Sequence, residues 1–460
     1  MRKVLVFFVA LLLALPAVGF AGSATSRWDM TLGGYVKFDL SYATKAVGTD
    51  NRLSPVDSKG GRDRGQDETG SLTWGSAETR LNWLVKGPDA WGAKTSAFVE
   101  GDFRAASASR GTTNQGEFGL RHAFMKFDWP TTTLLVGHTW QAWGMIPTLN
   151  TLAFSEEHFN KGATRVPQIR LTQKFGGFAV TAAAQSPYDV LTTNNVGNDP
   201  RANSLIPDLC LDFSYVSKAL GKIGPFGLKV GVGGFWGKDK YEYRPFDSTK
   251  INDETVDRYG AGLYWYVPII PEKKEGDKAM AFAFTGQLFA GKGMATYLPG
   301  YTHTGQVPGY SYFTSFPGAY NRRNSDALIT TNPTNLTAAT QGFDPAYYMT
   351  NGGWVQGTFY FTDKLFTNVV YGAEFNRMSS RFKDRYTDDY GATLYASESG
   401  IGVPERIQNV VVNLMYDVNQ AIRVGVEYDW VNTAYAYNGD ATHSNKGSFS
   451  SVRVGAYYFF

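Results

Sequence analysis

Apolar and polar side chains alternate along this chain in segment after segment, and within a segment the charged residues keep to one parity. In the segment over 31–42, one face collects the apolar side chains Leu32, Val36, Phe38, Leu40 and Tyr42. The other face collects Tyr35, Lys37, Asp39 and Ser41. A period of two is that of a β-strand, and an apolar face opposite a charged one predicts a strand between lipid and water. Charges in mid-strand are tolerated on a wet interior, so their shared parity predicts a water-filled lumen.

Such segments recur from about residue 30 to the end of the chain, joined alternately by short turns and long polar links. Counting them predicts about 16 strands, an even number, as bacterial single-chain barrels require. The longest link, over 292–352, is rich in Tyr, Thr, Pro and Gly. The predicted fold is therefore all-β: a transmembrane antiparallel β-barrel with long extracellular loops and short periplasmic turns. Its expected location is the bacterial outer membrane.

The C-terminal segment over 448–460 keeps the alternation to the last residue. Terminal residues of soluble proteins usually fray into water, whereas the last strand of a membrane barrel meets lipid and ends in an aromatic girdle. The spacing of Gly455, Tyr458 and Phe460 resembles the C-terminal insertion signal of bacterial outer-membrane barrels. This resemblance implies the barrel-assembly machinery and outer-membrane lipid as partners. An ordinary buried terminal strand is the alternative.

The N-terminus predicts export. Arg2 and Lys3 precede an apolar run over 4–15, and small residues lead up to Ala21. This is the pattern of a cleaved secretory signal peptide over 1–21. Removing Arg2 and Lys3 lowers the formal net charge from +3 to +1 (3 − 2), and a nearly neutral chain argues against nucleic acid as a partner. We expect residues 22–460 to form a single barrel domain.

The loop over 143–164, the third long loop, carries the main candidate site. It contains the acidic pair Glu156 and Glu157. In sixteen-stranded general porins the third loop folds into the lumen and narrows it, and this chain resembles them in strand number and loop order. We therefore expect Glu156 and Glu157 at a pore constriction. The alternative is that both are solvated loop charges.

Basic residues with inward parity predict the opposite wall of the constriction. They lie on the second, third, fourth and sixth strands: Arg80, Lys94, Arg104, Arg121 and Arg170. Acidic loop residues facing a basic wall would create a field across the narrowest point, and such a field selects solutes by charge.

Several segments resemble the DcaP-like trimeric porins. They lie mainly in the first third of the mature chain: Leu32–Lys37, Val99–Phe103, Leu120–Phe124, Leu135–Trp140 and Arg165–Arg170. The resemblance implies a homotrimer that passes small anionic or dicarboxylic solutes. The acidic pair Glu156–Glu157 departs from a purely anion-selective design.

The predicted function is passive diffusion of small hydrophilic solutes and ions, without a cofactor. Enzyme signatures such as H-E-x-x-H and G-x-S-x-G are absent from the sequence, so we expect no catalysis or metal site. One alternative is a structural or adhesive surface barrel with a plugged lumen. Another is a solute-specific channel for dicarboxylates or sugars, since Phe235, Tyr264 and Tyr266 have inward parity. A soluble secreted β-sandwich is the rival fold.

Overall fold

A computed structural model of the chain describes most of the predicted barrel. The described residues are 28–45, 54, 57, 70–105, 117–144, 150–152, 165–186, 204–243, 252–294, 297, 319–321, 345–347, 349–377, 404–435 and 444–460. The predicted signal peptide over 1–21 and the acidic pair Glu156 and Glu157 lie outside these residues.

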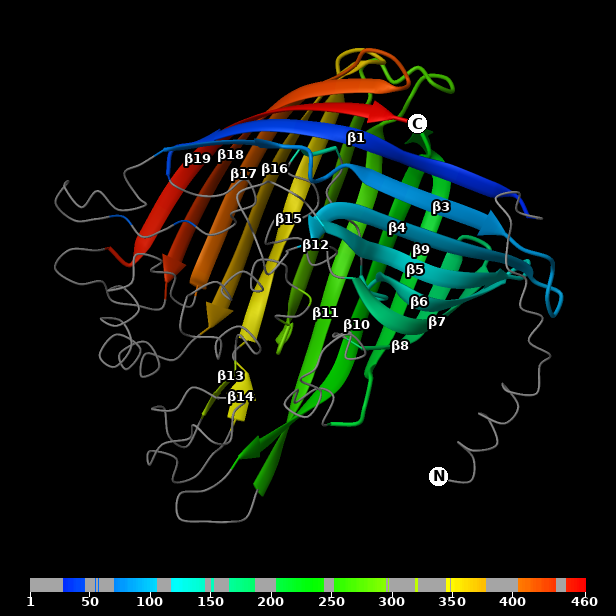
Figure 1. The fold of residues 1–460 in the computed structure, drawn as a ribbon, viewed down its shortest axis with the longest axis vertical. Helices are drawn as coiled ribbons and strands as arrows, with labels where there is room; N and C mark the ends of the chain where they lie inside the picture. Colours follow the sequence, from blue (N-terminus) through cyan, green and yellow to red (C-terminus); the bar gives the residue numbers. More distant parts are fainter. Residues whose placement is uncertain are drawn as a thin grey trace.

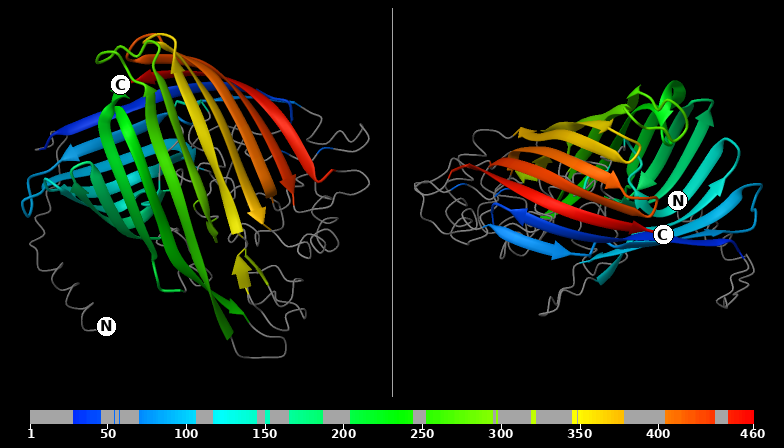
Figure 2. Two further views of the ribbon diagram at one scale, coloured as in Figure 1. Left: turned by 180° about the vertical axis from the view of Figure 1, so that it is seen from behind. Right: turned by 90° about the horizontal axis from the view of Figure 1, so that it is seen from above.

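One antiparallel sheet of 17 strand segments closes on itself, and Figures 1 and 2 show it wrapping round into a continuous wall. In the first half of the chain the segments are β1 Met30–Ala43, β2 Ser71–Gly75, β3 Arg80–Lys86, β4 Lys94–Ala105, β5 Glu117–Asp128, β6 Thr132–Trp140, β7 Arg165–Phe175, β8 Phe178–Gln185 and β9 Asp208–Ile223. In the second half they are β10 Phe226–Tyr243, β11 Asn252–Ile270, β12 Phe282–Lys292, β15 Met349–Tyr360, β16 Leu365–Arg377, β17 Pro404–Asp417, β18 Ile422–Tyr435 and β19 Lys446–Phe459.

Segments β2 and β3 together make a single barrel strand. Both pair with β1, β3 along its first half and β2 along its second half. The barrel therefore has 16 strand positions (17 − 1), as the alternation predicts. β3 begins only at Arg80, because the chain leaves the sheet after β2. This break turns Glu78 toward the interior, where its side chain is buried.

The two ends of the barrel chain meet along one seam. β1 pairs with β19 from Tyr35 opposite Phe459 to Ala43 opposite Ser451. Gly34 and Phe460 exchange two backbone hydrogen bonds of 3.2 Å each. The C-terminal strand is thus a barrel strand that closes the sheet, and closure leaves no free edge. The described residues contain no helix long and apolar enough to cross a membrane.

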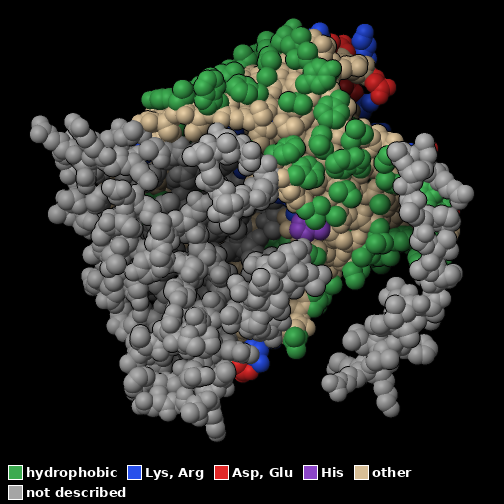
Figure 3. Space-filling view, viewed as in Figure 1, with side chains coloured by type: hydrophobic (Ala, Val, Ile, Leu, Met, Phe, Trp, Pro, Cys, Tyr) green, Lys and Arg blue, Asp and Glu red, His purple; other side chains and the backbone are tan. Residues whose placement is uncertain are grey.

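The two faces of the wall differ as the parity predicts. On β1, Val36 is 50% exposed, whereas the neighbouring Lys37 is only 1% exposed. The space-filling view shows hydrophobic side chains spread over the outer wall, with charged ones mainly at the upper right and at the lower tip (Figure 3). The outward residues of the last strand, such as Val454 and Tyr458, are equally exposed. An apolar outer wall around a polar interior is the arrangement of a membrane barrel.

A β-bulge on β5 changes which side chains of this strand face the interior. Glu100 of β4 pairs with His122, and the next residue, Gly101, pairs with Leu120. Arg121 is therefore an extra residue, and such a bulge disrupts the ladder locally and re-aims side chains. Both Arg121 and His122 are buried, so two adjacent side chains face the interior.

The long link over 292–352 contains structure that the sequence did not reveal. Two short strands, β13 Ala319–Asn321 and β14 Pro345–Tyr347, pair with each other outside the barrel sheet. β15 begins at Met349, inside the predicted link. β9, β10 and β11 are longer than the other strands, over 16, 18 and 19 residues.

Candidate functional site: a segment across the barrel interior

The chain after β6 turns into the barrel at Ala142, Trp143 and Gly144. The backbone N–H of Ala142 donates to Gln185 Oε1 at 2.9 Å, and that of Gly144 donates to Asp212 Oδ1 at 2.6 Å. Trp143 is fully buried, with its ring centroid 5.0 Å from that of Phe235. Residues of β8, β9 and β10 thus hold this end of the segment.

Only a few residues further along, the same segment meets a different wall. The backbone N–H of Leu152 donates to Glu427 Oε2 at 2.7 Å, and the Lys37 ammonium donates to the Leu152 carbonyl at 2.6 Å. Asn413 Nδ2 donates to the Asn150 carbonyl at 3.0 Å. These partners come from β18, β1 and β17.

The two walls lie on opposite sides of the barrel. In the closed strand order, six strands separate β9 from β18 on one side and eight on the other, with β2 and β3 counted as one. Gly144, fixed to β9, and Leu152, fixed to β18, therefore lie at opposite sides of the interior, and we call the described residues 142–144 and 150–152 the crossing segment. It belongs to the loop over 143–164 that the sequence singled out.

An apolar socket receives the side chain of Leu152. It packs in one buried cluster with Phe366, Met415 and Tyr457. Gly455 leaves the space for it, because a Cβ at this position would lie 2.8 Å from Leu152 Cδ2. Gly455 faces inward, whereas Tyr458 and Phe460 of the predicted insertion signal face outward and are half exposed.

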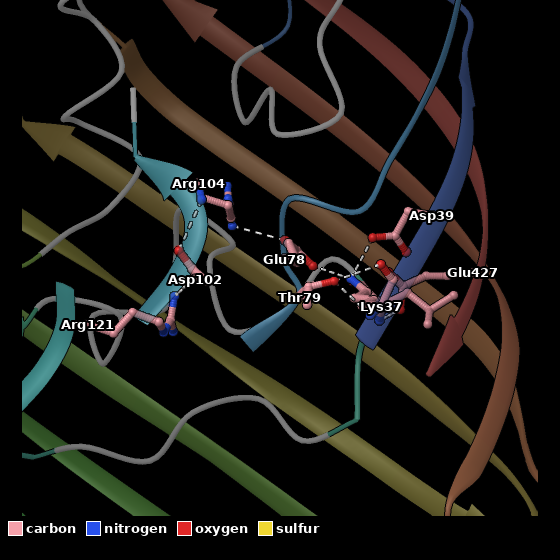
Figure 4. A network of polar contacts seen from close by, with 9 residues as sticks. Lys37, Asp39, Glu78, Thr79, Asp102, Arg104, Arg121 and Glu427 are labelled. Atoms are coloured by element: carbon pink, nitrogen blue, oxygen red, sulfur yellow. Dashed lines mark hydrogen bonds and ion pairs between the residues drawn. The ribbon is translucent and has the colours of Figure 1, made fainter. Parts of the chain in front are cut away.

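Lys37 stands at the centre of a buried charge network beside Leu152. It lies 2.8 Å from Asp39 Oδ2 and pairs with Glu78. Glu78 in turn accepts from Arg104 at 3.0 Å. Figure 4 shows Lys37 on β1 and Arg104 on β4 pointing toward Glu78 from either side. The broken strand between β2 and β3 makes this arrangement possible.

Arg121 continues the network on the bulge of β5. Its Nε donates to Glu100 Oε1 at 3.1 Å, and Nη1 donates to Asp102 Oδ2 at 2.5 Å. Arg80 approaches the same Glu100 oxygen at 3.4 Å. The three predicted arginines Arg80, Arg104 and Arg121 thus come together in one network along β3, β4 and β5.

The predicted basic wall therefore also contains acidic side chains. Four cations and four carboxylates make up the network: Lys37, Arg80, Arg104 and Arg121 with Asp39, Glu78, Glu100 and Asp102. Paired charges offset one another's desolvation, and the removal of one member leaves the other uncompensated. Such a surface presents both signs of charge to whatever passes it.

The other two predicted basic residues lie apart from this network. Arg170 on β7 faces inward, and its Nε donates to Gln168 Oε1 at 2.8 Å. Lys94 lies at the start of β4, where its side chain is 82% exposed and pairs with Asp89 at 2.7 Å. The structure therefore places Lys94 at the short-turn end of the barrel, away from the crossing segment.

On the wall formed by β15, β16 and β17, uncharged polar side chains make a chain of hydrogen bonds beside the segment. Gln356 Nε2 donates to Asn368 Oδ1 at 2.9 Å, and Asn368 Nδ2 donates to Asn413 Oδ1 at 2.8 Å. The aromatic residues Phe235, Tyr264 and Tyr266 face inward as predicted and are buried. Among the described residues, no group of three or more His, Cys, Asp or Glu side chains is placed to hold a metal ion.

Sequence reasoning missed the residues that fix the crossing segment. Asn150 and Leu152 are an ordinary polar and an ordinary apolar loop residue, and their backbone partners Asn413 and Glu427 lie far away in the sequence. Glu427 has inward parity on a clear strand, but its partner Leu152 lies 275 residues away. For Glu78 the available signal was Gly75, because a glycine within a strand pattern often marks a place where the strand is interrupted.

A closed 16-strand antiparallel barrel with an apolar outer wall is a porin-like fold, as found in outer-membrane barrels. The chain resembles, with a TM-score of 0.62 and 17% identity, the outer membrane channel DcaP of Acinetobacter baumannii, over 96% of this chain and 99% of that one. An anion-selective porin from Comamonas acidovorans matches with a TM-score of 0.51 and 12% identity, over 94% and 100%. No protein-family model and no curated protein matches the chain.

These likenesses confirm the fold predicted from the sequence, including its resemblance to the DcaP-like porins. At such low identity they bear on the fold alone.

Proposed function

We propose that the protein is a diffusion channel that lets small hydrophilic solutes and ions cross the outer membrane. The observation that carries this proposal is the segment from Gly144 to Leu152, fixed to opposite walls beside a charged network. A segment in that position narrows the lumen without filling it with apolar core. Solutes then pass close to Arg80 and Arg104, whose side chains remain 17% and 19% exposed.

Charge selection would occur where the loop over 143–164 faces this network. Glu156 and Glu157 follow the crossing segment by only a few residues, and we propose that they add negative charge at the constriction. Closely spaced groups of both signs create a transverse field that orients dipolar solutes. The channel would accordingly favour small zwitterionic or dipolar solutes over bulky apolar ones.

Export and assembly complete the proposal. Residues 1–21 act as a cleaved signal peptide, and the aromatic C-terminal strand is read by the barrel-assembly machinery. The mature chain assembles as a homotrimer in outer-membrane lipid. Two structural neighbours, an outer membrane channel and an anion-selective porin, support a channel function.

The decisive experiment is single-channel recording in planar bilayers with the purified, heat-modifiable barrel. We expect stable open steps that appear in threes, and a reversal potential under a salt gradient that reports ion preference. The variant Glu156→Gln/Glu157→Gln should shift that potential away from cations. Absence of conductance from a correctly folded barrel would defeat the proposal and favour a structural or adhesive surface protein.

A further inference from the structure

A second buried charge cluster lies on the long-link side of the barrel. Arg258 on β11 is 2% exposed and sits between two carboxylates. Its Nη2 donates to Asp208 Oδ1 at 2.7 Å, and its Nε donates to Asp239 Oδ1 at 2.7 Å. Two carboxylates around one guanidinium leave an excess negative charge that needs further hydrogen-bond donors.

Two tyrosines at either end of the link over 292–352 supply those donors. The Tyr297 hydroxyl donates to Asp208 Oδ2, and the Tyr347 hydroxyl donates to Asp239 Oδ2. Both side chains are buried. Burial and the adjacent Asp208 carboxylate raise the pKa of Tyr297 well above its ordinary value, so the phenol keeps the proton that it donates.

Tyr297 also touches the near end of the crossing segment. Its ring centroid lies 5.8 Å from that of Trp143 and 4.6 Å from that of Phe235. Gln185 joins the two by hydrogen bonds: its Nε2 donates to Tyr297 Oη at 2.7 Å, and its Oε1 accepts from the backbone N–H of Ala142 at 2.9 Å.

We infer that Tyr297 is a positioning residue for the crossing segment, and that the Asp208–Arg258 pair holds Tyr297 in place. The link after β12 therefore supports the constriction from inside the barrel, through a described residue that lies five positions after β12 ends. This inference rests on the proposed channel function. Trp143 is the surface through which the support acts, because it is fully buried against Tyr297 and Phe235.

The test measures how firmly the crossing segment is held, with a readout that needs no current. Thr151 in that segment is 4% exposed, so a Thr151→Cys reporter in a Cys210→Ser background should react slowly with a small maleimide. Tyr297→Phe keeps the ring and removes the donor to Asp208. The variant also removes the acceptor of Gln185 Nε2, and the loss of these two buried hydrogen bonds should raise the labelling rate about tenfold or more. Tyr347→Phe, which removes the equivalent donor at Asp239, is the matched control and should leave the rate within about twofold of the parent.

Three results would overturn the inference. The first is an unchanged labelling rate in Tyr297→Phe, and the second is an equal rise in Tyr347→Phe. The third is that the effects of Tyr297→Phe and Trp143→Leu on the labelling rate add up in the double variant. A contact that acts through Trp143 predicts that Tyr297→Phe adds little once Trp143 is replaced. Should Tyr297→Phe fail to give a heat-modifiable barrel, Gln185→Met tests the other half of the same contact. Single-channel recording of the same variants separates the two proposals. Absence of wild-type current would sink the channel function, whereas normal wild-type current with no labelling response in Tyr297→Phe would sink only the positioning role of Tyr297.

Discussion

The ammonium of Lys37 lies 2.6 Å from the carbonyl oxygen of Leu152, a residue 115 positions further along the chain. Lys37 is 1% exposed and Leu152 is fully buried. Glu427 holds the N–H of the same leucine at 2.7 Å. The backbone N–H and C=O of Leu152 are thus each bound by a buried side chain of opposite charge, Glu427 on β18 and Lys37 on β1.

Replacing Lys37 with Met should remove the hydrogen bond to the Leu152 carbonyl, weaken the attachment of the crossing segment to β1, and enlarge the pore. The methionine keeps most of the side-chain volume but leaves Asp39 and Glu78 without their shared cation, which costs about 3 kcal/mol of stability. We expect higher single-channel conductance and a lower temperature of heat modification. Lys94→Met is the matched control, because Lys94 pairs with Asp89 on the exposed rim and should change neither quantity. An unchanged conductance in Lys37→Met would contradict the role assigned to the Lys37–Leu152 hydrogen bond.

Arg121→Gln should move ion preference toward cations. The substitution keeps hydrogen-bond donors but leaves Glu100 and Asp102 with one positive charge fewer, in a site where Arg121 is 5% exposed. The reversal potential under a salt gradient measures this shift. Because the two buried carboxylates lose a cation, the variant should also be about 3 kcal/mol less stable. Lys126→Gln on the same strand is the control, since Lys126 is 38% exposed and paired with Asp128. Equal reversal potentials for wild type and Arg121→Gln would place the ion path elsewhere.

Gly455→Val should displace Leu152 without preventing barrel assembly. A Cβ at position 455 would meet Leu152 Cδ2 at 2.8 Å and Asp39 Oδ1 at 3.0 Å, so the side chain of the crossing segment must give way. We expect normal amounts of heat-modifiable barrel in the outer-membrane fraction, with raised conductance. Phe460→Ala provides the contrast, because Phe460 is outward and half exposed and its loss should reduce assembly. If Gly455→Val fails to reach the membrane, the insertion-signal role of Gly455 is the better account.

The stabilisation provided by Glu275, in the turn between β11 and β12 outside the membrane, should depend on pH. Its Glu275 lies 2.7 Å from Lys222 Nζ, and this hydrogen bond and charge lower the pKa of Glu275. A lowered folded-state pKa means that the stabilisation is present above the ordinary glutamate pKa and lost as pH falls through the lowered value. Carboxyl-carbon NMR in micelles should show Glu275 titrating below other exposed glutamates. Lys222→Gln should restore an ordinary pKa, whereas Lys273→Gln in the same turn should leave the titration nearly unchanged.

Much of the fold was predictable because it rests on local pattern. A strand between lipid and water must alternate, and the inward parity of Lys37, Asp39 and Arg121 was legible from neighbouring residues alone. The exceptions are places where the backbone departs from regular pairing. The bulge at Arg121 and the break before Arg80 depend on how β4 and β1 fit against their neighbours, and a single strand pattern carries no information about that fit.

The candidate site was predictable in part. The sequence indicated the loop over 143–164 and the inward arginines Arg80, Arg104 and Arg121. It placed Lys94 with them, although the structure puts this lysine at the exposed start of β4. It also led to an expectation of a basic wall, because parity shows which residues face inward but not which of them pair. The pairing of Arg121 with Glu100 and Asp102 depends on the bulge.

By itself, the sequence determined that this chain builds about 16 alternating strands, with apolar side chains outward and charges inward, since period and parity are properties of consecutive residues. Only the tertiary structure decided where the loop crosses and what holds it. Lys37, Leu152 and Glu427 are scattered over nearly the whole chain, and they become neighbours only when β1 pairs with β19 and the sheet closes. Ring closure is a long-range event, and the contacts that it creates inside the barrel leave no local pattern in the sequence.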